Sequence, residues 1–199
     1  PDGTIVVRSR EFDLPADPFD GWLAGTEILI IRPDKTREIV TLEEPIEDVA
    51  TPDARTLVVA TRDNLVWYDI AAQKVVRTIP GRALLADDGK AALLAKETRH
   101  KALERKQTWT LVDTQVPDRR QKFEASNCQF NVGGSHFMCT FFFDDERTEV
   151  RVIRTSDGMV EAVRLGFNVG AGWISPDGHR VLHVDDHTAP FASKEHIVG

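Results

Sequence analysis

The sequence of 199 residues has few cysteines, tyrosines and methionines, and it has no long apolar run. No stretch approaches the roughly 18 consecutive apolar residues that a membrane-spanning helix needs, which excludes a membrane span of that kind. No charged start precedes an apolar segment, so no signal peptide is recognisable. The net charge of −7 argues against broad nucleic-acid binding and against attraction to an anionic membrane surface. We therefore expect a cytoplasmic protein without membrane or nucleic-acid partners.

The composition is that of a folded domain, with 41% hydrophobic and 29% charged residues. A chain of this length and composition is expected to bury the core of one domain. The sequence starts at Pro1-Asp2-Gly3 without an initiator methionine. We take this as an expectation that the chain is a piece of a longer protein.

Only two cysteines are present, Cys128 and Cys139, which is too few for a disulfide framework. They are candidates for adjacent strands of one hairpin that turns near Gly133-Gly134. We expect them about one residue out of register and therefore on opposite faces. Two buried thiols are the favoured interpretation, and a single structural disulfide is the alternative.

Motifs that carry chemistry are also missing from the sequence. It has no nucleophile elbow, no phosphate-binding loop, no dinucleotide fingerprint and no paired CxxC motifs. Ser135 and Ser175 fall in expected turns without a plausible base and orienting group. The sequence therefore predicts no catalytic residue, no metal site and no cofactor.

A short turn motif recurs along the chain, and an apolar run follows it each time. Its anchor residues are separated by 51, 35, 45 and 44 residues: Gly3, Ala54, Gly89, Gly134 and Gly178. Its fullest form is Ser-Pro-Asp-Gly at 175–178. Pro presets φ for a tight turn, Asp bonds its own backbone, and Gly adopts the left-handed conformation. We interpret the motif as a hairpin turn between a first and a second strand.

Each repeat divides into four short strands. Continuous apolar runs such as "TLVVATR" follow the anchors, and they are typical of strands buried on both faces. A partly alternating third strand and a more polar fourth strand come next. We expect 17 or 18 strands, with the first repeat lacking its inner strand and the last lacking its outer strand.

Four strands per unit at a period of roughly 40–45 residues indicate a β-propeller. The units resemble WD-repeat blades and, more closely, the Pro-Asp-Gly blades of TolB-like propellers. Tyr68-Asp69 and Val112-Asp113 stand where WD repeats have Trp-Asp, while blades one and four have Arg32 and Arg154. We expect about four to five four-stranded antiparallel blades from a larger propeller; closure of a small ring by the chain ends is the alternative. The expected blades are 1–45, 46–81, 82–126, 127–166 and 167–199.

Long connections after the second strands are the expected binding face, because loops carry binding more often than strands do. The longest is Ser9–Thr26, in which Phe19 and Trp22 are candidate anchors for a protein partner. The alternative is that these side chains pack onto their own blade. The basic segment Lys96–Lys106 is a second candidate contact, or a solvated loop or short helix.

Acidic residues follow the second strand in two consecutive repeats, and they define a candidate acidic rim: Asp144, Asp145, Asp185 and Asp186. A hard cation would need more oxygen ligands at defined spacing than these segments offer. Three histidines near the end of the chain are candidate zinc ligands together with Asp185 and Asp186: His183, His187 and His196. Their placement in an expected strand and loop favours structural and solvated histidines instead.

The sequence favours a non-catalytic β-propeller that acts as a protein–protein interaction scaffold within a larger protein or complex. The partner is expected on the loop-rich face. Similar propellers accompany prolyl-oligopeptidase-type hydrolases, so an accessory domain of such an enzyme is a second hypothesis. A propeller that holds a small molecule or metal in its central channel is a third.

Overall fold

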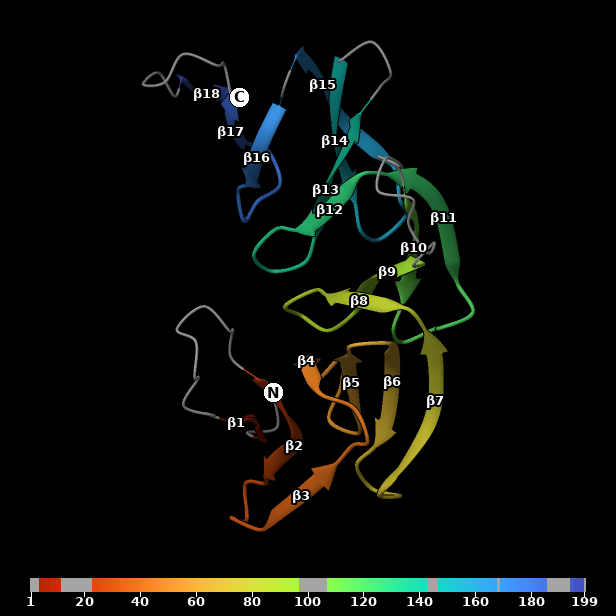
Figure 1. The fold of residues 1–199 in the computed structure, drawn as a ribbon. Coiled ribbons are helices and arrows are strands. Elements are labelled where there is room, and N and C mark those ends of the chain that lie inside the picture. Colours follow the sequence, from red (N-terminus) through yellow and green to blue (C-terminus); the bar gives the residue numbers. More distant parts are fainter. Residues whose placement is uncertain are drawn as a thin grey trace, which may run out of the picture. The chain divides into compact units, whose positions relative to one another are not determined.

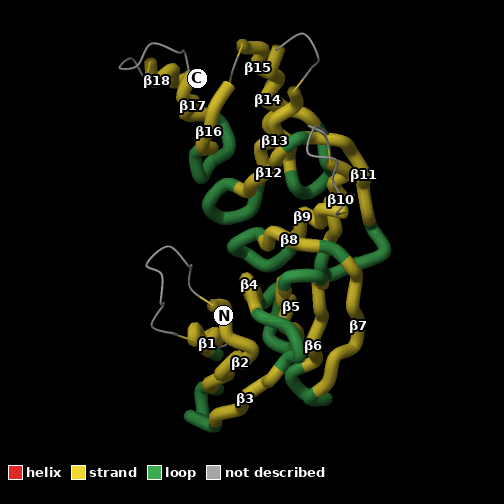
Figure 2. The backbone as a smooth tube through the Cα atoms, viewed as in Figure 1, coloured by secondary structure: helices red, strands yellow, loops and turns green. Residues whose placement is uncertain are grey.

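The computed structural model describes residues 4–11, 23–96, 107–142, 147–167, 169–185 and 194–198. These residues form 18 strands in five antiparallel sheets (Figure 1), and within these ranges there is no helix (Figure 2). Consequently, no helix in the described ranges is suited to cross a membrane. The expected all-β fold class is confirmed.

The chain divides into two compact units between Ala83 and Leu84. The first unit holds a three-stranded sheet, β1-β2-β3, and a four-stranded sheet, β4-β5-β6-β7. Its buried core joins Ile28, Ile30 and Val40 of the first sheet to Leu57 and Val59 of the second. The strands are β1 (Ile5–Glu11), β2 (Leu23–Ile31), β3 (Arg37–Thr41), β4 (Ile46–Ala50), β5 (Thr56–Thr61), β6 (Asn64–Asp69) and β7 (Lys74–Pro80).

The second unit contains two four-stranded sheets, β8–β11 and β12–β15, and a three-stranded sheet, β16-β17-β18. Leu93, Trp109 and Phe137 belong to the core between its first two sheets. Met138 and Val152 belong to a second cluster, which also holds Ile174 of the last sheet. The strands are β8 (Arg82–Leu85), β9 (Ala91–Lys96), β10 (Gln107–Asp113), β11 (Arg120–Ala125), β12 (Asn127–Phe130), β13 (His136–Phe142), β14 (Arg147–Arg154), β15 (Val160–Phe167), β16 (Val169–Ile174), β17 (Val181–Asp185) and β18 (Lys194–Val198).

Burial follows the position of a strand in its sheet. The second strand β5 is buried at five of its six positions, whereas the outer strand β7 is exposed at five of seven. Successive side chains of a strand point to opposite faces, so β5 is buried on both faces and has to be largely apolar. This explains why the apolar runs after the turn motifs identify the second strands.

Within the described residues the Pro-Asp-Gly-like motifs are hairpin turns, as predicted, and the first motif, with its anchor Gly3, lies outside them. Gly89, Gly134 and Gly178 have φ values of +69°, +72° and +76°. Each of these glycines donates its amide hydrogen to the carbonyl three residues earlier, at 2.8, 3.1 and 2.9 Å. In the last turn the Asp177 carboxylate accepts the His179 amide hydrogen at 3.1 Å. A hydrogen bond from the Ser175 hydroxyl and then this amide lower the pKa of Asp177.

The two cysteines form a disulfide, so the expectation of two free thiols was wrong. The register of β12 and β13 is symmetrical about the Gly133–Gly134 peptide, which places Phe130 opposite Phe137 and Cys128 opposite Cys139. The Cα atoms of the cysteines are 4.2 Å apart, and both residues are buried. Directly opposed residues point to the same face of a sheet, so the expected offset of one residue does not occur.

The first long connection is shorter than the sequence suggested. Strand β1 continues to Glu11 and β2 begins at Leu23, with Glu11 opposite Leu23 and Arg10 opposite Ala24. Both ends of the expected loop Ser9–Thr26 are therefore strands. A register shift between Arg8 and Arg10 lets the hairpin continue past an irregularity.

Candidate functional site

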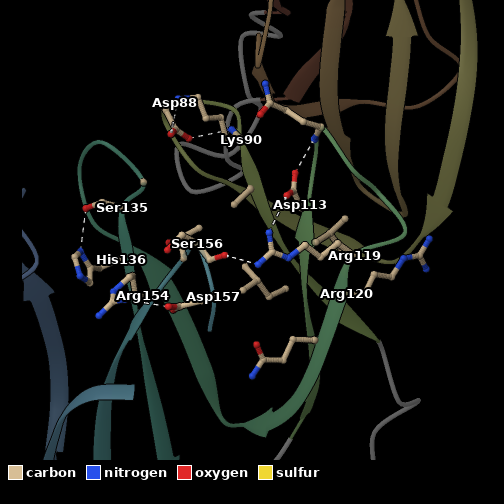
Figure 3. A pocket seen from close by; sticks show the side chains of 17 residues that line it. Asp88, Lys90, Asp113, Arg119, Arg120, Ser135, His136, Arg154, Ser156 and Asp157 are labelled. Carbon is tan, nitrogen blue, oxygen red and sulfur yellow. Dashed lines mark hydrogen bonds and ion pairs between the residues drawn. The ribbon is translucent and has the colours of Figure 1, made fainter. Parts of the chain in front are cut away.

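A cleft of about 560 Å³ lies between the sheets β8–β11 and β12–β15 of the second unit (Figure 3). It is lined by the turns that join first to second and third to fourth strands in both sheets. These turns contribute Asp88 and Lys90, Asp113 and Arg119, Ser135 and His136, and Arg154 to Asp157. In an antiparallel sheet these turns lie at the opposite end from the connections between second and third strands. The cleft is therefore on the other end of the strands from the predicted binding loops.

Contacts between neighbouring first turns fix one wall of the cleft. The Gly133 amide donates to the Asp87 carboxylate at 3.1 Å. A Cβ atom on Gly134 would lie 2.6 Å from the Cβ of Ala86, so only glycine fits there without displacement. The turn of one sheet is thus seated directly on the turn of the next.

The carboxylates of the cleft are held by their own turns. Asp113 accepts the amide hydrogens of Gln115 and Val116, at 3.0 and 3.1 Å. Asp88 accepts the Lys90 amide hydrogen at 2.9 Å. Asp157 accepts the Met159 amide hydrogen at 3.0 Å and also pairs with Arg154. A short acidic side chain that bonds its own backbone two or three residues on is a turn-forming device.

The basic side chains Arg119 and Lys90 make fewer close contacts within the protein than the carboxylates do. The Arg119 guanidinium donates to the Ser156 carbonyl at 2.9 Å and lies 3.9 Å from Asp113. Its side chain is 63% exposed, and that of Lys90 is 61% exposed. The Lys90 ammonium is 4.0 Å from the Asp88 carboxylate, at the limit of an ion pair. These cations retain donors directed to solvent, because a guanidinium has five N–H groups and an ammonium three.

A chain of polar side chains runs from the cleft to the outer strand β15. The Ser135 Oγ lies 2.9 Å from His136 Nδ1, and His136 Nε2 lies 2.8 Å from the Glu161 carboxylate. Arg154 forms an ion pair with the same carboxylate. Hydrogen bonds from Arg154 first and His136 second lower the pKa of Glu161.

A Ser-His-Glu sequence of hydrogen bonds is also found in hydrolases, but three backbone N–H groups around Ser135 already have acceptors within the protein. A tetrahedral intermediate needs unoccupied N–H donors beside the nucleophile. Here the Gly133 amide donates to Asp87, that of Gly134 to Asn131, and that of His136 to the Asn131 side chain. These three donors are already used to hold the turn.

Asn131 extends the network to the last sheet. Its side-chain amide donates to Ser135 Oγ at 3.1 Å and to the carbonyls of Ser175 and Pro176, at 3.2 and 2.8 Å. It is 3% exposed, so these bonds are made within the protein. The polar chain therefore links the β12–β13 turn to the β16–β17 turn and has a structural role.

The structure does not place most of the residues predicted for binding. Phe19, Trp22, Asp144, Asp145, Asp186 and His187 lie outside the described residues. Asp185 is the last residue of β17. Strands β17 and β18 pair with His183 opposite His196. Across the described ranges, no group of three or more His, Cys, Asp or Glu side chains is arranged to hold a metal ion.

The residues of the cleft were missed because most of them lie in short sequence motifs that are typical of turns. Asp88 belongs to a turn motif whose local role is complete in itself, and Asp113 was matched to the Trp-Asp position of WD repeats. The available signal was the recurrence of basic residues close to an acidic residue of a turn, as in Asp88-Gly89-Lys90 and Asp118-Arg119-Arg120.

No protein-family description matches the sequence, and no curated protein resembles it in sequence. Solved structures do resemble its fold. A structure described as the eukaryotic initiation factor has a TM-score of 0.58 at 12% identity, covering 88% of this chain and 47% of that one. Hsv2 from Kluyveromyces lactis has a TM-score of 0.51 at 14% identity, covering 83% and 54%. The β-propeller domain of the Trilobed protease from Pyrococcus furiosus has a TM-score of 0.50 at 16% identity, covering 76% and 53%.

The chain has the β-propeller fold. Its sheets are blades of a propeller, which confirms the expected β-propeller fold. The chain spans about half the length of the structures that it matches. The cleft therefore lies between two consecutive blades, on the face formed by their first and third turns.

Proposed function

We propose that the protein is a non-catalytic β-propeller that acts as a protein–protein interaction scaffold, and that the cleft between blades three and four receives part of the partner. The observation that carries this proposal is the cleft itself. It is about 560 Å³ in volume, built from four turns on rigid sheets, with exposed cationic side chains at its wall. A concave site on a rigid scaffold is a typical recognition site.

Binding is favoured over catalysis because the side chains that could act in catalysis are hydrogen-bonded to one another. Ser135, His136 and Glu161 hold one another, and Asn131 ties the same turn to the next blade. The N–H groups beside Ser135 already have acceptors within the protein. The polar surface that a partner would contact is therefore already formed. No cofactor, membrane or nucleic acid is part of the proposal.

Site-specific crosslinking tests this function. A photoreactive p-benzoylphenylalanine is introduced at Gln115, which is exposed and lines the cleft, and separately at Lys122, which is exposed on β11 and does not line it. In cells that make the full-length protein, we expect protein adducts at position 115 that are absent at position 122. The variant Phe19→Ala/Trp22→Ala, made in the same background, tests whether the predicted loop anchors contribute to the adduct.

Two results would contradict the proposal. Equal adducts at the two positions would show that the cleft is not a specific contact. Covalent labelling of Ser135 by a fluorophosphonate probe would show that the Ser-His-Glu chain is catalytic, as in the hydrolase hypothesis.

A further inference from the structure

We propose that the partner segment held by the cleft is acidic, and that Arg119 and Lys90 bind its side-chain carboxylates. This inference rests on the proposed interaction function and specifies the chemistry of the partner. It follows from the imbalance between donors and acceptors among the side chains that line the cleft.

The acceptors of the cleft are largely used. Each of Asp88, Asp113 and Asp157 accepts at least one backbone N–H of its own turn, at 2.9 to 3.1 Å. Asp157 also accepts a bond from Arg154 at 3.0 Å. Because each of these carboxylates is already bonded by donors of its own turn, it is a weaker site for a cationic partner than an unbonded carboxylate.

The donors of the cleft are in excess. Lys90, Arg119, Arg120 and Arg154 line it, against three carboxylates. Arg154 is paired with both Asp157 and Glu161, and Arg120 points away from the Asp113–Arg119 pair in Figure 3. Arg119 and Lys90 remain, each with about two thirds of its side chain exposed.

Arg119 is positioned for a carboxylate by its existing contacts. One end of its guanidinium is fixed by the Ser156 carbonyl of the neighbouring blade at 2.9 Å. A planar guanidinium fixed at one edge presents its remaining N–H groups in a fork that matches a carboxylate. The interaction with Asp113 spans 3.9 Å, which is long for a hydrogen bond and leaves that fork available.

The net charge of the whole chain favours a peptide over a nucleic acid. A chain with a net charge of −7 repels a long polyanion, whose binding depends on many phosphate contacts. Two exposed cations suffice for one or two carboxylates of an otherwise uncharged segment. The same negative surface disfavours acidic partners elsewhere, so the cleft gives specificity as well as affinity.

The test uses two fluorescein-labelled decapeptides in fluorescence anisotropy titrations with the full chain. Both have serine at eight positions, and the two central residues are glutamates in one peptide and glutamines in the other. We expect the glutamate peptide to bind and the glutamine peptide to bind at least about tenfold more weakly, because charge-assisted bonds are lost. Arg119→Glu should weaken the glutamate peptide by about tenfold or more, and Lys90→Glu should have a similar effect. Lys122→Glu carries the same charge change on the same unit outside the cleft, and it should leave the affinity within about twofold.

Equal binding of the two peptides, or no binding of either, would overturn the inference. Equal weakening by Arg119→Glu and Lys122→Glu would also overturn it, since it would indicate nonspecific attraction. Tighter binding of a labelled oligouridylate than of the glutamate peptide would overturn the inference in favour of a nucleic acid as the partner. If crosslinking at Gln115 succeeds while the glutamate peptide fails, only this inference falls and the interaction function stands.

Discussion

Gly178 of the fifth blade lies directly over the imidazole of His136 in the fourth. A Cβ atom at position 178 would sit 2.1 Å from His136 Nδ1. His136 is itself held by Ser135 on one nitrogen and by Glu161 on the other. The ring therefore cannot move aside without breaking the polar chain that joins these turns.

Gly178→Ala is expected to destabilise the protein by about 2 kcal/mol or more, because both the contact with His136 and the φ of +76° oppose a side chain. Gly133→Ala is the matched control, since its φ is +91° but no atom lies within 4 Å of the position that a Cβ atom would take there. The free energy of unfolding of that variant should fall by only about 1 kcal/mol, which is the cost of placing alanine in the left-handed conformation. Urea denaturation measures both, and equal losses would contradict the steric argument.

The disulfide should be present in the native protein and should stabilise it. The replacement of both Cys128 and Cys139 by alanine is expected to lower the free energy of unfolding by about 2–3 kcal/mol, the range for a loop of this size. Thiol titration of the unfolded, unreduced protein should detect no free thiol. Two free thiols per chain would contradict the pairing.

Two threonines occupy corresponding positions in blades three and four, and their replacement by valine should affect the stability of the protein differently. Thr114 donates its hydroxyl to the Gly89 carbonyl, whereas the buried Thr155 hydroxyl has no hydrogen-bond partner in the described part of the chain. Thr114→Val is expected to cost about 1–2 kcal/mol because it leaves a buried carbonyl short of a donor. Thr155→Val should be neutral or slightly stabilising. Thermal unfolding compares them, and a larger loss for Thr155→Val would contradict the assignment.

Acid should weaken the polar chain of blade four through Glu161, which bonds His136 and Arg154 of the same blade. Its pKa in the folded state lies below the usual value of 4.5 because Arg154 and His136 bond the ionised form. The stabilisation is therefore complete above the unfolded-state pKa and is lost as the pH falls through the folded-state pKa. Between pH 6 and pH 3 the melting temperature of the wild type should fall more steeply than that of Glu161→Gln. Parallel curves would show that this carboxylate adds no pH-dependent stability.

Local patterns explain how far the sequence predicts the fold. Runs such as Thr56–Thr61 identify second strands because a strand covered on both faces has to be continuously apolar. The motif at Ser175 to Gly178 identifies a turn because Asp and Gly have local conformational roles. The register of Cys128 and Cys139 required the exact centre of the turn, and an error of one residue exchanges the two faces of the strand.

The cleft could not be predicted in the same way. Arg119 and Ser156 are 37 residues apart in sequence, and their hydrogen bond exists only because two blades lie side by side. The same holds for Asp87 and Gly133. From the sequence each repeat was interpreted separately, so Asp88 was assigned to turn formation and Asp113 to the position of the Trp-Asp dipeptide, and their basic neighbours received no shared role.

The neighbour-to-neighbour bonds of the first turns also constrain how this protein can vary. Gly133 contacts the turn before it and Asn131 the turn after it, so the β12–β13 turn is fitted on two sides. One inserted residue in that turn would break contacts with both neighbours at once. Insertions and deletions should therefore be confined to the connections between second and third strands, and a library of length variants should recover folded proteins from that end of the blades alone.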